Sequence, residues 1–166
     1  MGVEIERKFL IKNISDIPLE LSKYSFHSIE QGYICTDPVI RVRRRDDEYI
    51  LTVKGEGLLS REEHELPLTE ESYNTLRDKA DGIIINKRRY IIPLPDAMLG
   101  EPLDSELSTL KVELEIFGGL HQGLIIAEIE FPSEEAATGF TPPEWMSQDV
   151  TMDTRYHNSN LSKSRP

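Results

Sequence analysis

The sequence predicts a mainly β (α+β) fold, an antiparallel sheet with a few peripheral helices. Apolar and charged residues alternate with a period of two along most of the chain, which is the pattern of half-buried strands. Stretches with a helical pattern are short. The 166 residues suffice for one globular domain with its own core and are few for two. We therefore expect a single domain over residues 1–158 and a polar, frayed tail over residues 159–166.

Two stretches have helix start and stop signals. The first covers residues 15–24, with Ser15 or Asp16 as its N-cap and a proline in its first turn. The second covers residues 69–80, with Thr69 as its N-cap, two glutamates in its first turn and a glycine just beyond its end. We expect a helix at each.

The rest of the non-strand sequence is short helix or connection. Residues 133–137 begin with acidic residues and predict a third, shorter helix. Residues 92–110 contain turn residues without a sustained period, so we expect a long connection there. Glycines within residues 118–123 indicate a hairpin or short loop between two strands.

The predicted strands have one charged face and one apolar face. Side chains two apart in a strand point to the same side of the sheet, so each residue can be assigned to a face. The stretch 61–65 is an exception, because both of its faces are polar, and alternation turns His64 outward there. In chain order, the charged faces contain Glu4, Glu6 and Lys8; Arg41 and Arg43; Lys54; Lys87 and Arg89; Glu113 and Glu115; and Glu128 and Glu130.

These charged faces allow two interpretations. An ordinary antiparallel sheet with one solvated face has the same period, but such a face normally mixes hydroxyl and amide side chains with charges. Here the faces carry charge and little else, and acidic and basic pairs lie on different strands. Closing the sheet into a barrel with these faces inward would bring both signs into one lumen. Buried charges need partners or a ligand, and a triphosphate with Mg²⁺ or Mn²⁺ fits both sets.

Composition excludes several other classes. Asp and Glu total 30 against 19 Lys and Arg, and a net charge of -11 argues against general binding to nucleic acid or to an anionic membrane. Cys35 is the only cysteine, so no intrachain disulfide or CxxC motif exists. No apolar run approaches the roughly 18 residues of a spanning helix. We expect a cytoplasmic protein.

The pattern resembles that of a known family. Residues 4–8, Glu-Ile-Glu-Arg-Lys, match the ExExK signature of the CYTH superfamily, the triphosphate tunnel metalloenzymes. Its members include class IV adenylate cyclases, thiamine triphosphatases and inorganic tripolyphosphatases. In order and spacing the similarity covers nearly the whole chain. It continues through Gln31-Gly-Tyr33, Arg41-Val-Arg43, Leu51-Thr-Val-Lys54, Arg61-Glu-Glu63-His-Glu65, Lys87-Arg-Arg89-Tyr90, Glu113-Leu-Glu115-Ile-Phe117, Ala127-Glu-Ile-Glu130, Val150-Thr151, Arg155-Tyr156 and Asn158.

The resemblance implies a closed eight-stranded antiparallel tunnel and a role for each charged residue. Glu63 and Glu65 match acidic positions that position or deprotonate water, and Lys8 joins them in catalysis. The metal ligands, for Mg²⁺ or Mn²⁺, would be Glu4, Glu6, Glu128 and Glu130, with Glu115 where relatives usually carry Asp. The triphosphate clamp would be Lys8, Arg41, Arg43, Lys54, Lys87 and Arg89.

The sequence leaves the substrate and the oligomeric state undecided. The start of the chain resembles the short bacterial members, so hydrolysis of inorganic tripolyphosphate is the first hypothesis. Hydrolysis of a nucleoside triphosphate such as ATP, or of thiamine triphosphate, is the second, and cyclisation of ATP the third. A polyphosphate- or nucleotide-binding module without turnover is a different class; the number of carboxylates favours an enzyme. A homodimer is also open.

Overall fold

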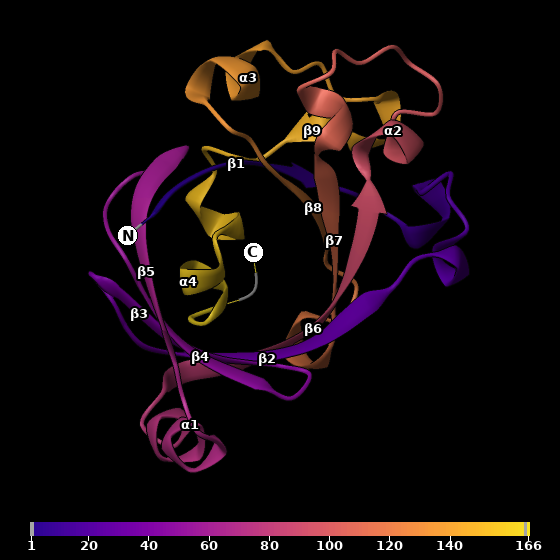
Figure 1. Ribbon diagram of the computed structural model, residues 1–166. Coiled ribbons are helices and arrows are strands. Elements are labelled where there is room, and N and C mark those ends of the chain that lie inside the picture. The colour runs from indigo at the N-terminus through magenta and orange to yellow at the C-terminus, as the bar shows by residue number, and fades with distance from the viewer. Residues whose placement is uncertain (1, 165) are drawn as a thin grey trace.

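Eight strands form a closed antiparallel barrel (Figure 1). The structure is a computed structural model that describes residues 2–164 and 166; Met1 and Arg165, at the start of the predicted domain and in the predicted tail, lie outside the described residues. The strands hydrogen-bond in the order β5-β4-β3-β2-β6-β7-β8-β1, and a β5–β1 pairing closes the ring. This confirms the predicted fold class. The strands are β1 (Gly2–Leu10), β2 (Phe26–Thr36), β3 (Val39–Arg45), β4 (Glu48–Lys54), β5 (Ser60–Pro67), β6 (Asp81–Pro93), β7 (Lys111–Phe117) and β8 (Ile125–Glu130), with β9 (Gln148–Asp149) added beside β1.

The first strand closes the barrel by dividing itself between two neighbours. Its first part pairs with β5, with Gly2 opposite Glu63 and Glu4 opposite Arg61. Its second part pairs with β8, from Glu6 to Leu10. Each strand then has one face toward the interior, as the alternation predicts.

Short helices cover parts of the barrel. In α1 (Glu70–Arg77) the Thr69 hydroxyl accepts a hydrogen bond of 3.1 Å from the backbone N–H of Ser72, as expected for its N-cap. The expected helix near residue 134 is also present. The remaining helices are α2 (Leu94–Ala97), α3 (Glu134–Gly139), α4 (Asn158–Leu161) and the 3₁₀ turns η1 (Ile14–Asp16), η2 (Leu21–Lys23), η3 (Leu107–Thr109), η4 (Gly119–His121), η5 (Glu144–Met146) and η6 (Thr154–Tyr156).

The structure corrects two expectations about local structure. The helix expected over residues 15–24 is wrong: the segment forms η1 and η2 instead. Ile17 has extended backbone angles, φ -80 and ψ 114, because the proline that follows it disfavours the α conformation. The connection over 92–110 is also more ordered than expected, since it contains α2 and η3.

The expectation that the residues after Asn158 are frayed is also wrong for the segment through Ser162. Leu161 is 0% exposed and Ser162 1% exposed. Within the barrel Leu161 contacts a cluster of inward-facing apolar residues, which explains the order of this segment. Figure 1 shows α4 inside the outline of the ring. The cluster consists of Tyr33, Val39, Ile85, Phe117, Ile126 and Leu161.

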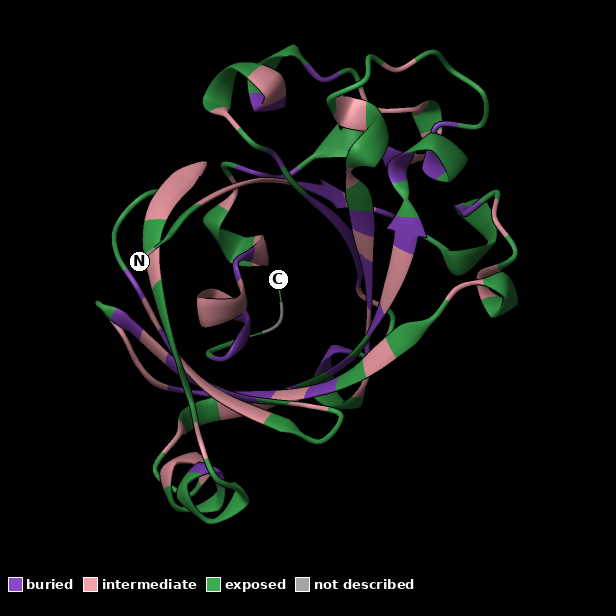
Figure 2. Cartoon of the chain, in the orientation of Figure 1, coloured by how far each residue is buried: buried purple, intermediate pink, exposed green. Residues whose placement is uncertain are grey.

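The larger core lies outside the barrel wall. The outward faces of β1, β6, β7 and β8 are covered by the segments that carry α2, α3 and η5, and Figure 2 shows buried residues concentrated along this side. By contrast, both faces of β5 carry polar residues, and His64 is exposed, as predicted. Central members of this core are Phe9, Leu94, Val112, Leu114, Ile129, Phe140 and Met146.

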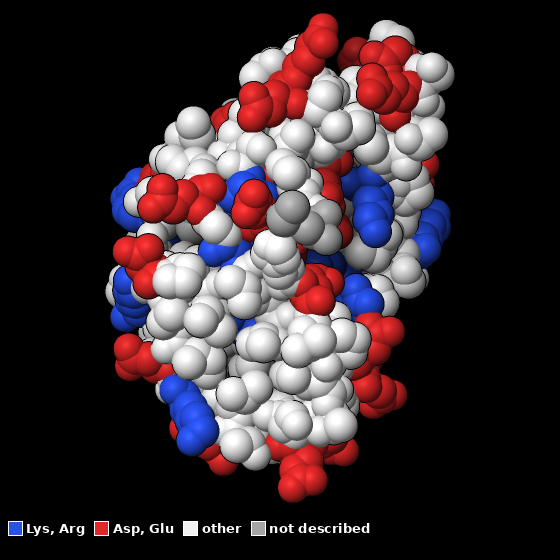
Figure 3. All heavy atoms as spheres, turned by 60° about the vertical axis from the view of Figure 1, so that its left-hand side comes forward, with Lys and Arg blue, Asp and Glu red and all other residues white. Residues whose placement is uncertain are grey.

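The surface carries mixed charge. Figure 3 shows acidic side chains spread over one face, with basic side chains between them rather than in one continuous patch. None of the helices in the described part of the chain has the length and apolar composition to cross a membrane.

Candidate active site

The barrel encloses a charged cavity of about 300 Å³, here called the chamber. Every strand from β1 to β8 contributes at least one lining side chain, because alternation turns the same face of each strand inward. One residue of α4 lines it as well. The lining residues are Glu4, Glu6, Tyr33, Arg41, Arg43, Arg45, Lys54, Arg61, Glu63, Glu65, Arg89, Glu113, Glu128, Glu130 and Asn158.

Nearly all the site residues predicted from the sequence line this chamber. The exceptions are Lys8, Lys87 and Glu115, which lie directly behind the lining. Each of them forms an ion pair with a neighbouring charged residue. The structure therefore brings the predicted acidic and basic sets together in one place.

Lys8 bridges two carboxylates. Its ammonium nitrogen lies 2.7 Å from Oε1 of Glu128 and 3.2 Å from Oε1 of Glu6. Burial opposes the ionisation of Glu128, but the positive charges of Lys8, Lys87 and Arg89 outweigh it and hold its pKa below the ordinary value. Burial and the charges of Glu128 and Glu4 raise the pKa of Glu6, although Lys8 opposes them.

A second cluster surrounds Glu115, which is fully buried. Its Oε1 accepts hydrogen bonds from Arg89 Nε at 2.8 Å and Nη2 at 2.5 Å, and lies 3.2 Å from the ammonium nitrogen of Lys87. Arg89 also reaches Glu113 at 3.2 Å. Burial, with the charges of Arg89 and Arg43, lowers the pKa of Lys87 to about 8 against the opposing effect of Glu115. The other oxygen of Glu115, Oε2, is buried and has no hydrogen-bond partner among the described residues.

Lys54 and Glu4 form a third pair, with 2.7 Å between Lys54 Nζ and Glu4 Oε2. Arg61 Nε lies 4.0 Å from the same oxygen. Burial opposes the ionisation of Glu4, but Lys54 outweighs it and lowers the pKa of this carboxyl. Glu4 is therefore held as a carboxylate at the edge of the chamber.

Two arginines are bound differently, because neutral groups hold them. Arg41 donates from Nη2 to the Thr52 hydroxyl at 3.0 Å, and Arg43 donates from Nε to Oε1 of Gln31 at 3.1 Å. Neither forms an ion pair with any residue that the structure describes. Burial and the neighbouring charges of Arg41 and Arg89 lower the pKa of Arg43 to about 9.

Several lining residues were not given a role from the sequence. Glu113 and Arg61 lie on faces that alternation assigns correctly, in phase with Glu115 and Glu63, so the pattern already contained the signal for them. Arg45 follows from the same period on β3. Asn158 belongs to the C-terminal part of the family resemblance, but alternation gave it no role, because it lies on α4 and not on a strand.

Glu63 and Glu65, predicted to act on water, line the chamber from β5. In the described part of the chain neither forms an ion pair or a side-chain hydrogen bond. Both carboxylates are therefore free for a ligand or water.

The match to known proteins agrees with this geometry. The CYTH domain family matches residues 2–138. The chain belongs to the CYTH domain family. A Nitrosomonas europaea protein named inorganic triphosphatase is 37% identical to this CYTH protein, over 98% of this chain and 99% of its own length. A protein of the same name from Acetivibrio thermocellus is 36% identical, over 99% of this chain and 96% of its own.

Solved structures give the same result for the fold. The crystal structure of an inorganic triphosphatase superimposes on this CYTH protein with a TM-score of 0.67 and 33% sequence identity, covering 100% of this chain and 98% of that one. A Pyrococcus horikoshii protein with 19% identity covers 82% of each chain with a TM-score of 0.55, which shows the shared fold alone.

The chamber of this CYTH protein fits the divalent cation that the resemblance implies. Oxygens of Glu113, Glu115 and Glu128 lie within 4.8 Å of one another, close enough for one ion. Carboxylate oxygens are the ligands that Mg²⁺ and Mn²⁺ prefer, and Oε2 of Glu115 has no other partner among the described residues. Burial and the charges of Glu4, Glu113 and Glu6 raise the pKa of Glu130, so negative charge is crowded here in a way that a cation would relieve.

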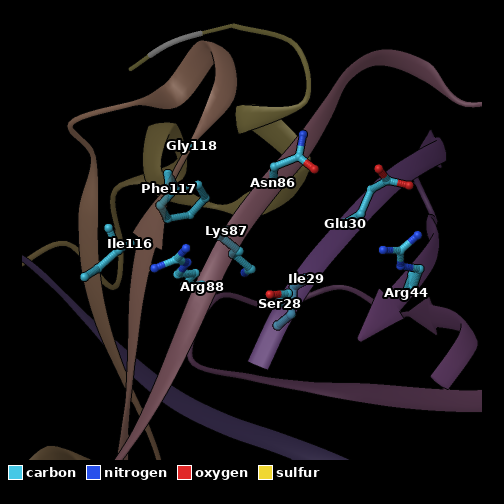
Figure 4. Close-up of a pocket in the computed structure, with 10 residues that line it drawn as sticks. All are labelled: Ser28, Ile29, Glu30, Arg44, Asn86, Lys87, Arg88, Ile116, Phe117 and Gly118. Carbon is cyan, nitrogen blue, oxygen red and sulfur yellow. The ribbon is translucent and has the colours of Figure 1, made fainter. Parts of the chain in front are cut away.

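A separate groove of about 430 Å³ lies on the outside of the barrel, over β2, β6 and β7 (Figure 4). It contains the outward residues Arg44, Asn86 and Arg88 and the carboxylate of Glu30. Glu30 is already paired with Arg77 at 2.7 Å. Lys87, a predicted site residue, and Phe117 also line this groove, but none of the other predicted site residues does.

Proposed function

We propose that this CYTH protein hydrolyses inorganic triphosphate (tripolyphosphate) with the help of Mg²⁺ or Mn²⁺. The observation that carries the proposal is the chamber itself, where two arginines without carboxylate partners face an array of carboxylates. The two arginines would bind phosphate oxygens, and the carboxylates would bind a divalent cation. The relatives named inorganic triphosphatase support the same substrate.

The residues divide the reaction between them. Arg41 and Arg43 bind phosphate oxygens, assisted by the paired cations Lys8, Lys54, Lys87 and Arg89. Glu63 and Glu65 hold the attacking water and accept its proton, since they have no other charged partner among the described residues. The cation would be held by Glu4, Glu6, Glu113, Glu115, Glu128 and Glu130. When bound, it supplies charge neutralisation at the phosphate oxygens and stabilises the leaving phosphate in an in-line displacement.

The lining favours the inorganic substrate over ATP or thiamine triphosphate. Tyr33 is the only aromatic among the described lining residues, and it packs into the apolar cluster with α4. A base or thiazole ring would therefore find little apolar surface beside the phosphates within the chamber. Inorganic triphosphate needs only charged groups, which seven of the eight barrel strands supply to the chamber lining.

The test offers metal-stripped protein tripolyphosphate, ATP and thiamine triphosphate separately and measures phosphate release. Release from tripolyphosphate that requires added Mg²⁺ or Mn²⁺, and that is fastest with this substrate, is the expected result. Faster phosphate release from ATP or thiamine triphosphate would assign that compound as the preferred substrate instead of tripolyphosphate. Cyclic product from ATP without phosphate release would indicate a cyclase, and binding without any product would indicate a non-catalytic module.

A further inference from the structure

The cations of the lumen fall into two groups. Members of the first group form ion pairs with carboxylates. Lys8, Lys54, Arg61, Lys87 and Arg89 pair with lumen carboxylates, and Arg45 pairs with Glu48 outside the lumen. Arg41 and Arg43 form no ion pair with any described residue, although both are buried. Neutral side chains on neighbouring strands hold them: Gln31 holds Arg43, and Thr52 holds Arg41, whose side chain Tyr33 also contacts. Gln31 and Thr52 are the fully buried members of this neutral set.

Strand register places these two residues. Gln31 on β2 is directly opposite Arg43 on β3, and Thr52 on β4 is directly opposite Arg41. Directly opposed residues on one face of an antiparallel pair have close side chains. Both neutral residues are 0% exposed, so water does not compete for their contacts.

The hydrogen bond fixes the orientation of the Gln31 amide. An arginine can only donate, so the oxygen of Gln31 must face Arg43 Nε, and its NH₂ group must point elsewhere. That NH₂ group is buried and has no partner among the described residues, and the same holds for Nε of Arg41. Buried donors without acceptors are unfavourable. Two of them beside the chamber indicate a ligand that brings acceptor oxygens.

We propose that Gln31 and Thr52 are positioning residues that orient Arg43 and Arg41 through neutral oxygens and so keep both guanidinium groups available to phosphate. The inference rests on the proposed function. A carboxylate at position 31 or 52 could also accept the hydrogen bond and orient the guanidinium group. It would also neutralise the arginine and compete with the phosphate oxygens for the same donors.

The first test replaces Gln31 with glutamate, which has nearly the same shape. Binding of tripolyphosphate is measured by calorimetry without divalent cation, so that no turnover occurs. We expect Gln31→Glu to raise the Kd on the order of tenfold, because the new carboxylate pairs with Arg43. The melting temperature should be retained, since the new pair also anchors both strands. Asn74→Asp, on the exposed surface of α1, adds the same charge away from the chamber and serves as the control.

The second test removes the Thr52 hydroxyl. Thr52→Val keeps the shape of the side chain, and we expect it to raise the Kd for tripolyphosphate several-fold, on the order of fivefold to tenfold, because Arg41 loses the group that orients it. Thr52→Ser should restore the wild-type Kd. A hydroxyl needed only for stability would lower the melting temperature of Thr52→Val without this selective loss of binding.

The results separate this inference from the proposed function. Unchanged Kd values in folded Gln31→Glu and Thr52→Val would overturn the positioning role, even if the wild-type protein hydrolyses tripolyphosphate. Weaker binding in both variants would support the role, even if the wild-type protein binds tripolyphosphate without hydrolysing it. In the active enzyme, the positioning role further predicts a larger change in KM than in kcat.

Discussion

The ammonium nitrogen of Lys8 lies 2.7 Å from Oε1 of Glu128, across the pairing of β1 with β8. Both side chains are almost fully buried. The contact thus joins the first strand of the chain to the last strand of the barrel and also fixes the Glu128 carboxylate in the chamber wall. A buried pair of this kind is costly to break on one side only, because the remaining charge loses its partner.

Lys8→Met should lower the free energy of unfolding by about 3–5 kcal/mol, because it leaves the Glu128 carboxylate buried without its closest partner. Denaturant unfolding measures this change. The double variant Lys8→Met with Glu128→Gln should regain part of the stability but none of the activity. A double variant no more stable than the single one would show that the two charges are not coupled.

Glu6→Ala should reduce phosphate release roughly a hundredfold or more while the barrel stays folded, because it removes a carboxylate proposed to hold the cation. Circular dichroism checks the fold, and a phosphate-release assay checks the rate. Glu62→Ala, on the exposed outer side of β5, is the control and should keep wild-type activity. Normal turnover by Glu6→Ala would exclude Glu6 from the metal site.

Arg43→Gln should raise KM for tripolyphosphate by about tenfold to a hundredfold, because it removes a charge-assisted contact to phosphate. The adjacent Arg44 is exposed on the opposite face of β3, so Arg44→Gln changes charge equally outside the chamber. Steady-state kinetics of the two variants make the comparison. Equal KM values would place Arg43 outside the phosphate-binding group.

Saturating tripolyphosphate should raise the melting temperature by roughly 5–10 °C at a hundredfold excess over Kd, because only the folded barrel gathers the charges that bind it. Omitting divalent metal limits turnover during the scan. Thermal unfolding monitored by circular dichroism measures this shift. No shift at saturation would contradict a lumen site for this anion.

Leu161→Ala should destabilise the protein by about 2–5 kcal/mol, because it leaves a cavity in the apolar cluster inside the barrel. Leu120→Ala is the matched control, since Leu120 is 65% exposed and Leu161 is 0% exposed. Equal melting temperatures of the two variants would show that α4 does not support the barrel.

The sequence predicted the barrel and its inward faces well because a period of two needs no knowledge of contacts. Alternation and charge placed Glu4, Arg41 and Glu128 on charged strand faces, and the resemblance to the CYTH superfamily implied that these faces line one lumen. The sequence did not predict the ion pairs. Which cation pairs with which carboxylate depends on strand register, and the register depends on how β1 divides between β5 and β8. From the sequence, Gln31 has no role of its own, although it lies in one of the family motifs. The alternation singles out charged residues, whereas the proposed role of Gln31 depends on its being neutral beside Arg43.

The two failures have different causes. The stretch 15–24 has helical caps, but a proline inside it interrupts the helix, a local effect that the capping signals concealed. The C-terminal segment is polar in composition, and a single leucine, Leu161, orders it by packing inside the barrel. Such a contact between distant parts of the chain leaves no periodic signal in the sequence.

The pairing of β1 with β8 also determines when, during synthesis of the chain, the complete chamber can form. Glu6 lies opposite Glu130, so the acidic half of the chamber is split between the two extremes of the barrel sequence. A nascent chain on the ribosome exposes Glu6 early, yet Glu130 on β8 emerges only after the six strands β2 to β7 have been made. Catalytic capacity thus arises late, as the ring closes, and partly synthesised chains should hydrolyse nothing.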